Sequence, residues 1–134
     1  MKNKLNAAQK KLVKKALEAR KNAYAPYSNF RVGSAIESSD GKIFVGCNVE
    51  DAAYSTTCCA ERVALFTAVC AGKKKFKRIA VASDADGACP PCGTCRQALM
   101  EFERDMEVIM ASPKGHTKLM RLADLLPEPF HSLR

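Results

Sequence analysis

Segments with helical and strand periodicity alternate along most of this chain, and that order constrains the fold more than any other feature. A hairpin opens the sheet: residues 31–37 and 42–48 are strand-like, and Ser38-Ser39-Asp40-Gly41 predicts the turn because Asp-Gly tolerates positive φ. Helix, strand, helix and strand are then predicted at residues 59–71, 79–83, 92–103 and 108–110. This alternation predicts a three-layer α/β/α fold with a central mixed β-sheet.

Two further helical segments flank this core. Asn6 and Gln9 have the spacing of a capping box, and the apolar residues that follow predict an amphipathic helix over residues 7–23. Pro26 ends that helix. A C-terminal helical tail is predicted from leucines at near-helical spacing, namely Leu119, Leu122, Leu125 and Leu126.

The length and composition indicate one ordinary globular domain. A chain of 134 residues is long enough for a single core, so we expect one domain over residues 1–134. The hydrophobic content of 47% is typical of such proteins, and the apolar runs are too short to span a membrane. The first residues lack the apolar core of a secretory signal, so we expect a cytoplasmic protein.

The chain is basic, with 22 Lys and Arg against 14 Asp and Glu, a net charge of +8. Such a surplus is found in nucleic-acid binders. Much of it lies in the first helix and in residues 73–78, where it also fits a solvated helix face and a basic loop. We favour the second interpretation and expect no specific nucleic-acid partner.

Seven cysteines without an export signal indicate metal binding, catalysis or buried thiols rather than disulfides. Cys59 begins one predicted helix, and Cys92 and Cys95 begin another. Right-handed crossovers place helix starts at a common edge of the sheet, so these thiols are expected to meet there. Glu61 follows Cys59 by two residues and would lie beside them.

The pattern Cys59-Ala60-Glu61 with Pro91-Cys92-Gly93-Thr94-Cys95 has the form of the zinc-deaminase motif, with Cys in place of His. Three protein ligands are typical of catalytic zinc, which lowers the pKa of a water at the remaining position. Glu61 would then move protons at this site. Arg62 and Arg96 would offset the excess negative charge of three thiolates by hydrogen bonding to sulfur, Arg62 the more strongly favoured.

Other interpretations of the cysteines stay open. The C-x-x-C pair could run thiol–disulfide exchange, although it comes late in the chain for a thioredoxin-like motif. Cys89 with Cys92 and Cys95 resembles part of an iron–sulfur run. Cys58 could close a four-cysteine structural zinc site. We expect ordinary thiols at Cys47, Cys58, Cys70 and Cys89.

Taken together, the sequence resembles the cytidine deaminase family, specifically its small homotetrameric type. Besides the two cysteine segments, residues 23–33, residues 46–50 and Leu125-Leu126-Pro127 contribute to this resemblance. It implies one Zn²⁺ per chain held by Cys59, Cys92 and Cys95. It also implies hydrolysis of cytidine and 2′-deoxycytidine to the uridine products plus ammonia, in pyrimidine salvage.

The resemblance also implies how a nucleoside is held. Phe30 would pack on the pyrimidine, and Asn48 and Glu50 would hold the ribose hydroxyl, a task suited to an amide and a carboxylate. Tyr54 and Phe130 would reach the nucleoside from neighbouring subunits, so that the homotetramer completes each site. Ala60 is a further expected substrate contact.

The sequence departs from the family pattern at two positions, and two alternative functions stay open. Asp51 stands where the family often has Asn, and Cys58 adds a thiol beside an expected ligand. A related deaminase could act on another substrate, such as a nucleoside antibiotic or an RNA base. A zinc-stabilised RNA-binding module would need no Glu61, and its binding would depend steeply on salt.

Overall fold

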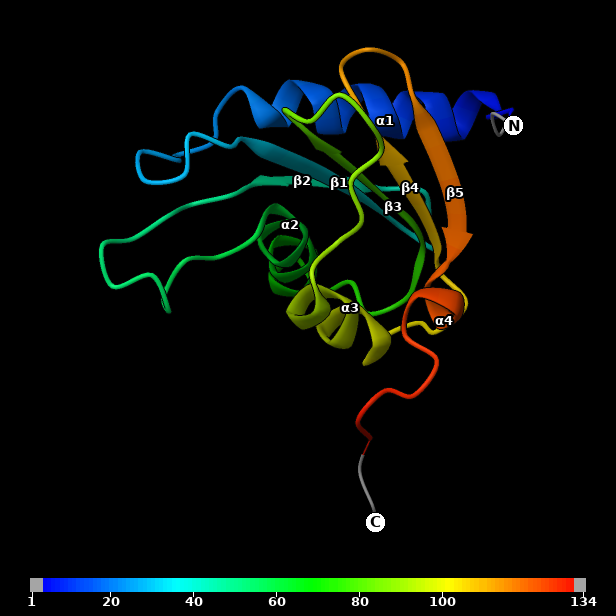
Figure 1. Ribbon diagram of the computed structural model, residues 1–134. Helices are drawn as coiled ribbons and strands as arrows, with labels where there is room; N and C mark the ends of the chain where they lie inside the picture. Colours follow the sequence, from blue (N-terminus) through cyan, green and yellow to red (C-terminus); the bar gives the residue numbers. More distant parts are fainter. Residues whose placement is uncertain (1–3, 132–134) are drawn as a thin grey trace.

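The computed structural model describes residues 4–131 as a sheet between two helical layers (Figure 1). Its elements are α1 (Ala7–Arg20), β1 (Val32–Ser38), β2 (Ile43–Cys47), α2 (Ala60–Cys70), β3 (Phe76–Ser83), α3 (Gly93–Met100), β4 (Glu107–Ala111), β5 (Thr117–Arg121) and α4 (Leu122–Leu125).

The sheet is mixed, as the sequence predicts. Its strand order is β2-β1-β3-β4-β5, with β3 and β4 parallel and the other three neighbouring pairs antiparallel. Helix α1 covers one face, and α2 and α3 cover the other (Figure 1). The three-layer α/β/α architecture is therefore confirmed.

Alternate residues of the central strands build two different cores. The face toward α1 presents mostly small side chains, including Ala35, Ala80 and Ala82, to Leu12 and Ala16. The opposite face is bulkier and larger, with its core made by Ile36, Ala64, Leu65, Ala68, Phe76, Ile79, Leu99, Met106, Val108, Met110 and Leu122. Because the alanines add little height, α1 lies close against the sheet.

Helix α1 begins as predicted and ends earlier. The side chain of Asn6 accepts a hydrogen bond from Gln9 N, and the side chain of Gln9 accepts one from Asn6 N, both at 2.9 Å, so the capping box is confirmed. The helix ends at Arg20 rather than near residue 23. The N–H groups of residues 21–23 bond to carbonyls three residues back, which tightens the chain into a turn before Pro26.

The hairpin is also confirmed, with β1 and β2 in antiparallel register and Gly41 at φ 86° in the turn. Gly72, at φ 88°, follows α2 as predicted. The apolar character of β2 does not translate fully into burial, because the side chain of Val45 is exposed whereas the neighbouring Gly46 is buried.

The prediction of a helical C-terminal tail is wrong for its first part. Residues 117–121 form β5, which pairs with β4 so that Leu119 lies opposite Ile109 and Met120 opposite Val108. Only one helical turn, α4, follows. The leucine spacing fits both a strand and a helix, and the free edge of β4 decides in favour of pairing. Helix α3 is likewise shorter than predicted and ends at Met100.

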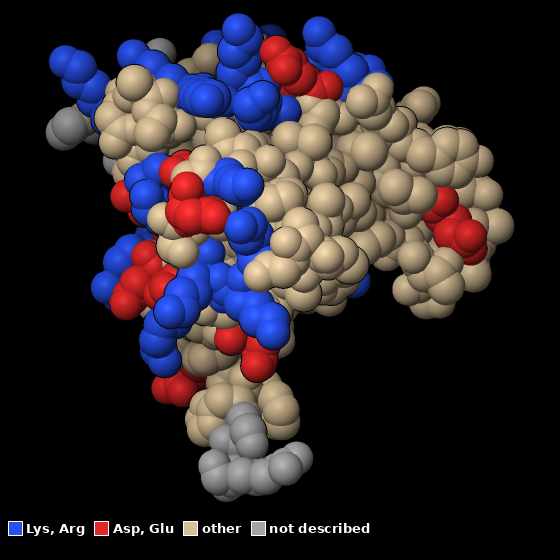
Figure 2. Space-filling view, turned by 180° about the vertical axis from the view of Figure 1, so that it is seen from behind, with Lys and Arg blue, Asp and Glu red and all other residues tan. Residues whose placement is uncertain are grey.

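Basic side chains gather over α1 and along the side of the molecule that holds β5 (Figure 2). The lobe at the right of that view, formed by the loop between β2 and α2, has few of them. The described helices include none that is both long and apolar enough to cross a membrane.

Close packing of α1 predicts a large effect of adding one methyl group. A Cβ at Gly33 would lie 2.0 Å from Ala16 O and 2.4 Å from Arg20 N, which are backbone atoms that can move only with the helix. We expect Gly33→Ala to lower the free energy of unfolding by about 1–3 kcal/mol or more. Gly87→Ala is the matched control, because a Cβ at Gly87 would meet nothing within 4 Å. Urea denaturation of both variants tests this, and equal stabilities would contradict the packing.

Candidate active site

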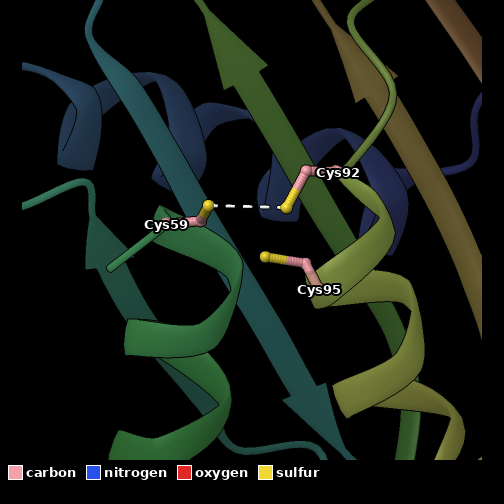
Figure 3. Close-up of side chains that lie close together, drawn as sticks. All are labelled: Cys59, Cys92 and Cys95. Carbon is pink, nitrogen blue, oxygen red and sulfur yellow. Dashed lines mark hydrogen bonds between the residues drawn. The ribbon is translucent and has the colours of Figure 1, made fainter. Parts of the chain in front are cut away.

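The two cysteine-bearing helices start at one edge of the sheet. Both β2 and β3 run antiparallel to β1, so they point the same way and lead into α2 and α3 at a common edge. Cys59 and Cys92 are the N-cap residues of these helices, with extended backbones and no side-chain capping bond. A capping Ser or Asp would turn its oxygen onto the helix backbone. The two thiols instead point toward one another (Figure 3).

Cys95, in the first turn of α3, completes a cluster of three sulfurs. The Sγ atoms of Cys59, Cys92 and Cys95 all lie within 4.8 Å of one another, and those of Cys59 and Cys92 are 3.5 Å apart. Tetrahedral zinc with Zn–S bonds of about 2.3 Å separates its sulfurs by about 3.8 Å. The cluster therefore fits a zinc ion bound by three thiolates.

Arg62 provides positive charge beside this cluster, as expected. Its Nη2 donates a hydrogen bond to Cys59 Sγ at 3.6 Å. Hydrogen bonds from Cys95, Arg62 and Cys92 lower the pKa of Cys59 to about 5 despite partial burial. The pKa of Cys95 is raised, first by its hydrogen bond to Cys59 and then by burial. The Cys59 thiol, which faces Arg62, therefore ionises more readily than the Cys95 thiol.

Arg96 does not share that role. Its Nε donates to Pro91 O at 2.9 Å and its Nη1 to Leu125 O at 3.1 Å. The expected hydrogen bond to sulfur is replaced by bonds to two carbonyls, because the side chain extends toward the C-terminal segment. Arg96 therefore fixes the loop before α3 rather than the charge on the sulfurs.

The alternative ligand sets do not form. Among residues 4–131, the metal-binding group contains Cys59, Cys92 and Cys95 and leaves out Cys58 and Cys89. The backbone of Cys58 pairs with Val49 in a two-bond bridge, and Cys89 Sγ points to Pro90 O at 3.7 Å. Neither the four-cysteine zinc site nor the iron–sulfur arrangement has a basis in this geometry.

Glu61 lies in the first turn of α2 with its side chain enclosed. It is only 4% exposed, and burial, aided by the nearby Cys59, raises its pKa to about 7. A carboxyl group with such a pKa exchanges protons readily near neutral pH. Its position beside the sulfur cluster fits the predicted proton carrier.

A pocket of about 200 Å³ opens beside the cluster. Its walls are Phe30, Val32, Asn48, Thr57, Cys59, Ala60, Glu61, Val81, Cys89, Pro90 and Cys92. Six of these were expected from the sequence as site residues. Val32 and Val81 also line the pocket but were not predicted as site residues, because their sequence context indicates only apolar strand positions. Thr57 and Pro90 were not predicted either, although their positions next to the cysteine segments could have indicated that they lie near the site.

Asn48 builds one wall of this pocket from the chain itself. Its Nδ2 donates to Phe30 O and its Oδ1 accepts from Val32 N, both at 2.9 Å. The amide thereby bridges the backbone on either side of Arg31. Phe30 is held at the pocket rim as a result.

Three of the expected substrate-binding residues lie outside this pocket within one chain. The carboxylate of Glu50 binds the turn at residues 27–28. Tyr54 is 70% exposed and packs edge-on against Tyr27, with ring centroids 5.7 Å apart. Phe130 is 78% exposed, although its backbone is held by the side chain of Gln97 through bonds of 2.8 and 3.0 Å.

Comparison with known proteins agrees with this geometry. The family model for the cytidine and deoxycytidylate deaminase zinc-binding region matches residues 6–112. A cytidine deaminase of Sporosarcina psychrophila is 46% identical over 121 residues, which cover 90% of this chain and 89% of that protein.

Solved structures agree as well. The cytidine deaminase of Burkholderia pseudomallei, at 43% identity, aligns with a TM-score of 0.88 over 94% of this chain and all of that one. The enzyme of Mycobacterium tuberculosis, at 33% identity, aligns with a TM-score of 0.82 over 95% of this chain and all of that one.

The sulfur geometry predicts different effects for neighbouring cysteines. Cys92→Ala removes one of the three clustered thiols, so we expect loss of bound zinc and a lower melting temperature together. Cys58→Ala, outside the cluster, is the control and should keep about one zinc per chain. Metal analysis of the two purified proteins checks this. A full zinc complement in Cys92→Ala would show that the ligand set is wrong.

Proposed function

This chain belongs to the cytidine and deoxycytidylate deaminase family, and we propose that its pocket holds free cytidine or 2′-deoxycytidine. The protein is a zinc-dependent cytidine deaminase, which converts cytidine and water to uridine and ammonia. The observation that carries the proposal is the enclosed carboxyl of Glu61, which lines a pocket beside three convergent sulfurs.

Cys59, Cys92 and Cys95 would hold one zinc ion per chain. When bound there, zinc supplies the Lewis acidity that makes water nucleophilic near neutral pH. The hydrogen bond from Arg62 and the N-termini of α2 and α3 stabilise the negative charge of the thiolates.

Glu61 is the proposed proton carrier. Its carboxylate takes a proton from the attacking water and gives it to N3 of the pyrimidine while oxygen adds at C4. It then takes the remaining hydroxyl proton and gives it to the amino group, which leaves as ammonia. Carboxylate and carboxylic acid alternate in this sequence, and a pKa near 7 makes both accessible.

Phe30, Asn48, Ala60 and Glu50 are proposed to hold the nucleoside. Phe30 and Ala60 line the pocket and would contact the pyrimidine, while the polar side chains of Asn48 and Glu50 would bind the sugar. The same contacts would accept a 2′-deoxy sugar through its 3′-hydroxyl. A free nucleoside suits a pocket of about 200 Å³ better than a structured RNA does.

We propose a homotetramer in which Tyr54 and Phe130 of neighbouring chains complete each site. Large aromatic side chains exposed to solvent in one chain support this, since such side chains are enriched at interfaces. The lobe that bears Tyr54 also has few basic side chains (Figure 2). A single catalytic domain over residues 1–134, a cytoplasmic location and a role in pyrimidine salvage complete the proposal.

The activity itself is tested by the loss of absorbance when cytidine, 2′-deoxycytidine or a structured RNA is added. We expect turnover of both nucleosides, release of ammonia and loss of activity with a zinc chelator. Turnover of RNA without turnover of the nucleosides would overturn the proposed substrate.

Glu61→Gln tests the proton carrier. An amide of the same shape cannot exchange protons, so kcat should fall by about 10²–10⁴-fold. Zinc content and melting temperature should stay close to those of the unmodified protein, because the sulfurs are untouched. Full activity in this variant would exclude Glu61 from the role.

Phe130→Ala tests completion of the site by a neighbouring chain. Loss of an aromatic contact should lower kcat/KM for cytidine by about tenfold. When Phe130→Ala chains are mixed and reassembled with Glu61→Gln chains, about one quarter of the sites should regain both residues. Light scattering gives the size of each assembly. Absence of recovery in mixed assemblies would contradict a contribution across chains.

A further inference from the structure

The hydroxyl of Ser28 lies between two of the residues proposed to hold the nucleoside. It donates a hydrogen bond to Glu50 Oε2, and it accepts one from the backbone N–H of Phe30 at 3.1 Å. These directions are fixed by chemistry, because an ionised carboxylate only accepts and a backbone N–H only donates. One side chain thus connects Glu50, the proposed sugar contact, with Phe30, the proposed base contact.

Glu50 depends on this turn for its orientation. Its Oε1 accepts from Tyr27 N at 2.9 Å and from Ser28 N at 3.1 Å, and Oε2 accepts from the Ser28 hydroxyl. A carboxylate offers about four acceptor positions, so the unused one is on Oε2. That oxygen is the one that Ser28 orients.

The charge of Glu50 agrees with a fixed acceptor. The hydrogen bond from Ser28 is the largest cause of a lowered pKa at Glu50, with the backbone N–H groups of Ser28 and Tyr27 adding to it. The group therefore stays ionised at neutral pH and cannot donate. It is suited to receive a hydrogen bond from a sugar hydroxyl.

The backbone after Ser28 has a conformation that needs support. Asn29 adopts φ 57°, the left-handed region, and its N–H bonds to Ala25 O at 3.0 Å. The Ser28 hydroxyl fixes the next N–H, that of Phe30, and Asn48 fixes the carbonyl of Phe30. Phe30 enters the pocket wall between these two anchors.

We propose that Ser28 is a positioning residue that aims Glu50 Oε2 at a sugar hydroxyl and seats Phe30 at the pyrimidine. This inference rests on the proposed function, because it takes the nucleoside contacts of Glu50 and Phe30 as given. The side-chain hydrogen bonds of Ser28 go to Glu50 and Phe30, and not to the clustered cysteines or Glu61, so we expect its effect on binding of the nucleoside rather than on proton transfer.

Substrates with and without sugar hydroxyls separate the two links. We expect Ser28→Ala to lower kcat/KM for cytidine by about tenfold, mainly through KM. For 2′,3′-dideoxycytidine, which offers Glu50 no ring hydroxyl, the loss should be about threefold or less and should reflect Phe30 alone. Ser28→Thr keeps the hydroxyl and should restore most of the activity on cytidine.

Two controls make the comparison specific. Ser39→Ala removes a hydroxyl at the opposite end of β1, in the hairpin turn, and should leave both substrates unaffected. In a Glu50→Gln background, Ser28→Ala should cause little further loss on cytidine, since the residue it orients has already been changed. Equal losses on the two substrates, or additive losses in the double variant, would overturn the inference.

The outcomes also distinguish this inference from the proposed function. A protein that does not deaminate cytidine at all contradicts the function, and equal activity of the unmodified protein on both nucleosides contradicts the role of Glu50. The inference about Ser28 fails when the unmodified protein prefers cytidine and Ser28→Ala keeps the same preference. If Ser28→Ala lowers the zinc content or the melting temperature, Ser28→Cys is tested in its place. Its thiol is similar in size to the hydroxyl but is a weaker hydrogen-bond donor.

Discussion

The site depends on the common direction of β2 and β3, which brings two helix N-termini to one edge of the sheet. Each helix begins with a cysteine whose thiol is free of capping bonds, and the partial positive charge of both N-termini favours thiolates there. The approach of α2 is fixed by Gly46, where a Cβ would lie 2.5 Å from Ala64 N. The position of Glu61 in the first turn of α2 thus depends on the close packing of α2 against Gly46.

The sequence predicted those parts of the fold and site that follow local rules. The capping box at Asn6, the Asp-Gly turn and the cysteine spacings act over a few residues, so they could be read directly. Strand β5 could not, because its pairing with β4 depends on an edge left free by the rest of the chain. Val81 and Val32 join the pocket for the same reason: only the assembled sheet shows which end of a strand faces the site.

Asn48 shows that a sequence motif can identify a site residue without revealing its structural role. The family resemblance implies a contact with the sugar, yet the amide of Asn48 already bonds to the backbone of Phe30 and Val32 and is nearly buried. An amide has two donors and two acceptor positions, so one of each is left for a ligand. Substitution of Asn48 would therefore disturb the proposed base contact of Phe30 as well as the proposed sugar contact of Asn48 itself.

Helix α3 couples the metal cluster to the C-terminal segment through consecutive residues. Cys95 faces the other sulfurs, Arg96 bonds to Leu125 O, and Gln97 bonds to both backbone groups of Phe130. A shift of α3 that accompanied loss of metal would therefore also move the exposed ring of Phe130. In the proposed homotetramer, zinc binding and completion of a neighbouring site would then be linked energetically, because one helix bears the contacts for both.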